Sequence, residues 1–124
     1  MVGINLGERR YSILGVLDEL NSFIGFAKSF AEKKKYARVL TEVQNNIFLI
    51  QAEIANPPNV FYKPRRISRD DIHFLEKQTF LAEKDLKKLD HFIIPEGDKF
   101  ACALHCIRTL SRRAERKIIK YGRK

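Results

Sequence analysis

Hydrophobic residues recur at intervals of three and four along most of this chain. From Tyr11 to about Ala31 the apolar positions are Ile13, Val16, Leu17, Leu20, Ile24 and Ala27. From Tyr36 to Ala55 they are Val39, Leu40, Val43, Ile47, Ile50 and Ile54. One buried face of an α-helix produces this spacing. The pattern therefore predicts two amphipathic helices over these segments.

A break and a third helix follow. Asn56-Pro57-Pro58-Asn59 ends the second helix because proline lacks a backbone donor, and we expect an extended loop as far as Arg66. Ser68, with Asp71 three residues later, is typical of a helix N-cap. The third helix is expected to carry Ile72, Leu75, Thr79, Leu86 and Leu89.

A fourth helix is predicted from about Lys99 to Tyr121, ended by Gly122. Its expected core face consists of Phe100, Ala103, Leu104, Ile107, Leu110, Ala114 and Ile118. No segment alternates with a period of two, and the chain has no internal repeat. We therefore expect an all-α fold in which residues 1–124 form a single domain, an antiparallel bundle of four main helices.

Composition adds a strong positive charge. The 124 residues carry a net charge of +9, which favours an anionic partner such as nucleic acid, a membrane surface or a nucleotide phosphate. The lysine runs at 33–35 and 84–88 are interpreted as solvated helix ends and faces. Charge alone does not choose among these partners.

The cysteines and the hydropathy indicate the compartment. Cys102 and Cys106, the only two cysteines, fit free buried thiols in a reducing interior. With His105 they are too few for a zinc site, so we expect no metal. No apolar run approaches the ~20 residues of a membrane span, and Met1 to Ser12 lacks a signal-peptide core. We expect a soluble, cytoplasmic protein.

The fourth helix carries a stripe of arginines. At ~100° per residue, Arg108, Arg112 and Arg116 fall on one flank, together with Glu115 and His105. Guanidinium groups at this spacing repel one another unless an anion lies between them, and their forked donors suit phosphate or carboxylate. The pattern indicates a phosphate-rich ligand or an acidic partner helix. The alternative is a solvated basic face on which Glu115 bridges the arginines.

The first helix carries a matching acidic feature. Gly15, Asp18, Ser22 and Gly25 share one side, and small residues allow another backbone to approach closely. Asp18 is a candidate partner for an arginine of the fourth helix, within the chain or across a subunit boundary. The alternative is an exposed helix acid. Phe92, just before Pro95, is interpreted by default as a hydrophobic anchor for the start of the fourth helix.

Four groups of residues together resemble a known family. They are residues 15–25 (GVLDELNSFIG), residues 43–48 (VQNNIF), the turn from Phe92 to Pro95, and residues 104–116 of the fourth helix, which end in RRAER. In order and spacing, over about residues 9 to 120, the sequence resembles the trimeric ATP:cob(I)alamin adenosyltransferases.

The resemblance implies a function and its residues. The family forms homotrimers in which cob(I)alamin, between two subunits, attacks the 5′ carbon of ATP and triphosphate leaves. It implies that Arg108 pairs with Asp18 of the partner subunit and that Phe92 presses on the lower face of the corrin and displaces the axial base. The ATP site would comprise Arg112, Arg113, Ala114, Glu115 and Arg116, with Mg²⁺ accompanying ATP. Neither a membrane nor a nucleic acid is expected as a partner.

Two family segments are not in this sequence. These are a Thr-Gly-Asp segment ahead of the first helix and an Asn-Arg-Leu-Ser-Asp segment in a last helix, and the family's phosphate-binding lysine falls on Leu6. Slow or absent catalysis therefore stays open. A separate alternative is a non-enzymatic basic helical oligomer that binds nucleic acid or an acidic protein.

Overall fold

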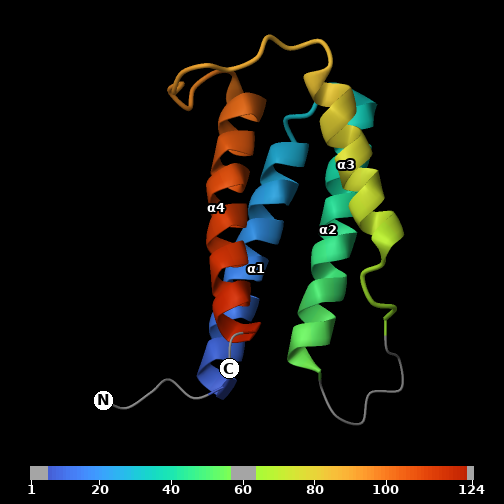
Figure 1. Cartoon of the computed structure of the whole chain (residues 1–124), viewed down its shortest axis with the longest axis vertical. Helices are drawn as coiled ribbons and strands as arrows, with labels where there is room; N and C mark the ends of the chain where they lie inside the picture. The colour runs from blue at the N-terminus through green and yellow to red at the C-terminus, as the bar shows by residue number, and fades with distance from the viewer. Residues whose placement is uncertain (1–5, 57–63, 123–124) are drawn as a thin grey trace.

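The computed structural model describes residues 6–56 and 64–122, which form four α-helices and no strand (Figure 1). The helices are α1 (Leu6–Lys28), α2 (Lys34–Ala55), α3 (Arg69–Glu83) and α4 (Lys99–Gly122). The predicted all-α fold is confirmed. Most of the predicted loop from Asn56 to Arg66 lies outside the described residues.

The core is built around α1, which packs against α4 along one side and against α2 along another (Figure 1). The fully buried core side chains are Ile13, Val16, Leu17, Leu20 and Ile24 of α1, Ile47 of α2 and Ala114 of α4. Partly buried side chains of α2 and α4, including Val43, Ile107 and Leu110, pack around them. These are the positions that the apolar periodicity predicts, so the burial of the first, second and fourth helices is confirmed.

A glycine allows α1 and α2 to approach closely. A Cβ atom at Gly25 would lie 3.2 Å from Nε2 of Gln44 on α2. That nitrogen donates to the backbone oxygen of Asn21 at 3.3 Å, and Oε1 of Gln44 accepts from Lys28 Nζ at 2.7 Å. Gly25 therefore serves packing within the chain, and the contact fixes α2 beside α1.

The third helix is shorter than predicted, and it lies outside the core. Its start is confirmed, because Oδ2 of Asp71 accepts the backbone N–H of Ser68 at 2.8 Å. However, α3 ends at Glu83, Leu86 and Leu89 are exposed, and no described side chain of α3 is buried. The charged run that follows Glu83 remains in solvent, and this outweighs the weak apolar spacing that continues through it.

Gly97 and Asp98 set the start of α4. The φ angle of Gly97 is 145°, and a Cβ there would lie 2.9 Å from that of Ala101. Oδ1 of Asp98 accepts the backbone N–H of Ala101 at 2.8 Å, which caps the first turn. The predicted burial of Leu104 is wrong, because it is exposed at the edge of the apolar face. Within the described ranges, no helix is both long and apolar enough to cross a bilayer.

Candidate functional site

A basic stripe runs along α4, opposite the side that packs on the core. Because Ile107 and Ala114 belong to the core, residues about 100–200° away around the helix face outward. The basic stripe is defined here as Arg108, Arg112 and Arg116, all of which are exposed. The three ion pairs found among the described residues involve none of these arginines. Glu115 is exposed too, and the alternative in which it bridges the arginines is not observed.

Asp18 on α1 is exposed and makes no ion pair with any described residue. The pairing of Asp18 with Arg108 inside one chain therefore does not form. On the same side of α1, a Cβ at Gly15 would meet nothing within 4 Å. Gly25 therefore packs against α2, whereas the surface of α1 around Gly15 and Asp18 is open.

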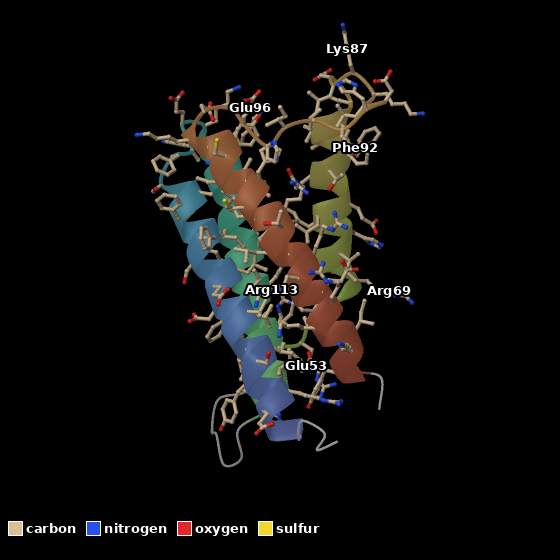
Figure 2. The ribbon with its side chains drawn as sticks, turned by 90° about the vertical axis from the view of Figure 1, so that its left-hand side faces the viewer. Glu53, Arg69, Lys87, Phe92, Glu96 and Arg113 are labelled. Atoms are coloured by element: carbon tan, nitrogen blue, oxygen red, sulfur yellow. The ribbon has the colours of Figure 1, made fainter. Side chains whose placement is uncertain are left out.

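Arg113 and Ala114 are neighbours of the basic stripe in the sequence but do not lie on the same side of α4. Arg113 is exposed but lies about 100° around the helix from Arg112, and Figure 2 shows it about midway along α4, on the side toward α1. Ala114 is only 4% exposed and packs in the core. The side chain of Ala114 therefore contributes packing.

Phe92 is fully exposed in the connection between α3 and α4. Figure 2 shows it at one end of the molecule, well away from Arg113 in the middle of α4. Its interpretation as a buried anchor for α4 is wrong, because Asp98 and Gly97 perform that task. Ile93 and Ile94 beside it are exposed as well, so this end presents an apolar surface.

The cysteines are exposed, so their predicted burial is wrong. Cys102 and Cys106 line a groove of about 450 Å³ between α4 and α1, opposite Phe23 and Phe26. They lie just outside the face of α4 that α1 covers. The spacing of apolar residues does not show where that face ends. His105 is half-buried, and among the described residues no cluster of three or more potential ligands is placed to hold a metal ion.

Two polar features escaped the sequence reasoning. Arg65 hydrogen-bonds to Asp71, and these bonds together with the Ser68 N–H hold the pKa of the Asp71 carboxyl well below its ordinary value. Apolar spacing could not predict this pair, because Arg65 lies in the loop before α3 and Asp71 lies within the helix. Asn46 is buried on the apolar face of α2 next to Ile47, and a polar residue within that repeat was a readable signal.

The comparisons with known proteins agree with one another. The sequence model of the family described as cobalamin adenosyltransferase matches residues 7–124. The corrinoid adenosyltransferase PduO of Salmonella typhimurium is 33% identical over 112 residues, covering 90% of this chain and 33% of that protein. For the corrinoid adenosyltransferase of Bacillus subtilis the identity is 32%, covering 89% of this chain and 58% of that protein. Corrinoid adenosyltransferase MMAB of Homo sapiens is 31% identical, covering 91% of this chain and 50% of that protein.

The chain thus spans between a third and three-fifths of the length of these three relatives. None of the comparisons supports the alternative of a basic module that binds nucleic acid or an acidic protein.

Proposed function

Because the chain belongs to the cobalamin adenosyltransferase family, we propose that it transfers the 5′-deoxyadenosyl group of ATP to a reduced corrinoid. Cobalt(I) of the substrate supplies the electron pair of the new bond to C5′. The C5′–O bond breaks, and its electrons leave with triphosphate. The names of the relatives, which are corrinoid adenosyltransferases in bacteria and mammals, support this reaction.

The observation that carries the proposal is the basic stripe of α4. Negative charge grows on the triphosphate as it departs, and positioned guanidinium donors stabilise such charge. Arg112 and Arg116 are one turn apart, exposed, and free of ion pairs with described residues, so their donors are available to phosphate oxygens. Arg113 and the backbone at Ala114 complete the ATP site.

Mg²⁺ accompanies ATP in this proposal. When bound to phosphate oxygens, the ion neutralises part of their charge. Glu115 fits it, because an exposed carboxylate without an ion pair to any described residue is a hard oxygen ligand. Glu115 would then bind on the same side as Arg112.

The active unit in this proposal is a homotrimer in the cytoplasm. Arg108 pairs with Asp18 of the partner subunit, which satisfies two charges that are exposed and unpaired in the described chain. The open space around Gly15 gives the second backbone room to approach. Phe92, an exposed ring on a connecting segment, lies under the corrin and takes the place of the axial base. The two free thiols fit a reducing compartment.

The test is anaerobic incubation of the protein with ATP and chemically reduced cobalamin. We expect light-sensitive adenosylcobalamin and free triphosphate. Arg112→Ala should slow the reaction by about 10²–10³-fold, as the loss of one charge-stabilising donor does elsewhere. Arg69→Ala, which removes an exposed arginine of α3 that makes no ion pair with a described residue, is the control and should stay within about twofold of wild type. Equal rates for both variants would contradict the proposal.

A further inference from the structure

A groove of about 800 Å³ lies between the N-terminal half of α2 and α3. Small-molecule sites commonly occupy about 300–1,000 Å³, so its size suits a ligand of nucleotide dimensions. Phe74 of α3 provides an aromatic wall, and Arg38 and Asn46 of α2 line the groove. The groove does not include any residue of the basic stripe.

The deepest polar group of the groove is Asn46. Its residue exposure is 6%, and its Oδ1 is buried without a hydrogen-bond partner. Buried acceptors in native proteins almost always have a donor. An unsatisfied acceptor that lines a groove calls for an N–H or O–H donor from a ligand. Asn46 therefore places a buried, unpaired acceptor in the groove, on an otherwise apolar helix face.

Charge divides the groove into two ends. Lys34, Lys35 and Arg38 lie at the start of α2, where the first turn has no acid and Lys33 provides no side-chain cap. The backbone N–H groups of a helix start and its dipole add to this positive charge. Three carboxylates also line the groove. Glu42 lies further along α2, beyond Arg38, and Asp70 and Asp71 lie on α3. They repel an anion, so an anionic ligand group must lie at the lysine end.

We propose that this groove binds a ribonucleotide group. Its phosphate contacts Lys34, Lys35 and Arg38, its base lies against Phe74, and a ribose hydroxyl or base N–H donates to Oδ1 of Asn46. Along α2 the Cα atoms of Arg38 and Asn46 are about 12 Å apart, a span that the long arginine side chain shortens to the length of a nucleoside monophosphate.

Two sources can supply this group. One is the nucleotide tail that cobalamin carries below its corrin ring, a source that rests on the proposed function. Figure 1 shows the start of α2 and the connection from α3 to α4, which carries Phe92, at the same end of the molecule. A tail displaced by Phe92 would therefore start at the end of the molecule where the groove has its lysines. The other source is a free nucleotide such as AMP.

The test measures the dissociation constants of cobalamin, of cobinamide, which lacks the nucleotide tail, and of AMP by calorimetry. Asn46→Leu keeps the side-chain volume and removes the acceptor. Asn45→Leu, at the exposed neighbouring position, is the matched control. If the tail is the source, wild type should bind cobalamin about tenfold more tightly than cobinamide, the effect of one or two hydrogen bonds. Asn46→Leu should bring this ratio close to one, and Asn45→Leu should preserve it.

If a free nucleotide is the source, AMP should bind wild type and Arg112→Ala alike but not Asn46→Leu. The comparison with Arg112→Ala separates the groove from the proposed ATP site. Should Asn46→Leu fail to fold, Lys34→Glu with Lys35→Glu replaces it, with Lys87→Glu and Lys88→Glu as the control of equal charge.

The inference is overturned if wild type neither prefers cobalamin to cobinamide nor binds AMP, or if Asn46→Leu binds all three like wild type. Its failure is distinct from failure of the proposed function. Adenosylation of both corrinoids, together with equal dissociation constants for cobalamin and cobinamide, would leave the proposed function standing and remove the tail from the groove. If neither corrinoid is adenosylated, the proposed function fails, and AMP binding alone decides the inference.

Discussion

Arg65 holds Asp71 through two hydrogen bonds, 2.7 Å from Nη1 to Oδ2 and 2.9 Å from Nη2 to Oδ1. The same carboxylate accepts the backbone N–H of Ser68, so one ionised group joins the preceding loop to the start of α3. Because the pKa of this carboxyl is lowered in the folded state, its stabilisation is complete above the ordinary pKa near 3.8. It is lost as the pH falls toward the lower folded-state pKa.

We therefore predict that Asp71→Asn weakens α3 at pH 7 and has a clearly smaller effect near pH 2, where only part of the stabilisation remains. Hydrogen exchange of the α3 amides measures this directly, since α3 is peripheral and opens independently of the core. Asp70→Asn is the control, because Asp70 makes no ion pair with a described residue. An effect of Asp71→Asn that does not change between the two pH values would refute the prediction.

Gly97→Ala should destabilise the protein by about 1–3 kcal/mol, the usual cost of forcing a side chain into such a backbone conformation. Its φ of 145° and the 2.9 Å approach to Ala101 both oppose a Cβ. Urea denaturation measures the change in the free energy of unfolding. Gly122→Ala is the contrasting variant, because its Cβ meets nothing within 4 Å in the chain and alanine favours a helix by about 0.5–1 kcal/mol. Equal effects at the two positions would contradict the account.

Ile24→Ala should lower the free energy of unfolding by about 2–5 kcal/mol, because the side chain is 1% exposed in the centre of the core. Phe23→Ala removes a larger side chain from the adjacent, exposed position. Thermal denaturation should show a clearly smaller loss for Phe23→Ala. A larger loss there would mean that Phe23 is buried in the working assembly.

The apolar spacing was sufficient to predict which faces of α1, α2 and α4 form the core, since burial of Ile13, Ile47 and Ala114 follows directly from helical geometry. It failed where apolar residues are spaced correctly but have nothing to pack against. Leu86 and Leu89 extend the α3 pattern into a lysine-rich segment and remain exposed. Periodicity reports which side of a helix is apolar and does not report whether a neighbour covers it.

The candidate site divides in a similar way. The sequence correctly placed Arg108, Arg112 and Arg116 on one exposed side of α4, because their direction depends only on the helix. It could not decide whether Asp18 meets Arg108 inside one chain, which depends on how α1 and α4 pack. The burial of Asn46 was not predicted, because helical spacing assigns the core to apolar residues, although an asparagine within an apolar repeat is visible in the sequence.

In the proposed trimer, Asp18 and the basic stripe meet between protomers, and mixing two defective variants can reveal this contact. Asp18→Ala and Arg112→Ala should each be nearly inactive in the anaerobic assay with ATP and reduced cobalamin. Co-expressed in equal amounts, they should recover about a quarter of the wild-type activity, because in a cyclic trimer that fraction of the boundaries joins an intact Asp18 to an intact Arg112. Mixed samples that stay as inactive as the separate variants would contradict a site shared between protomers.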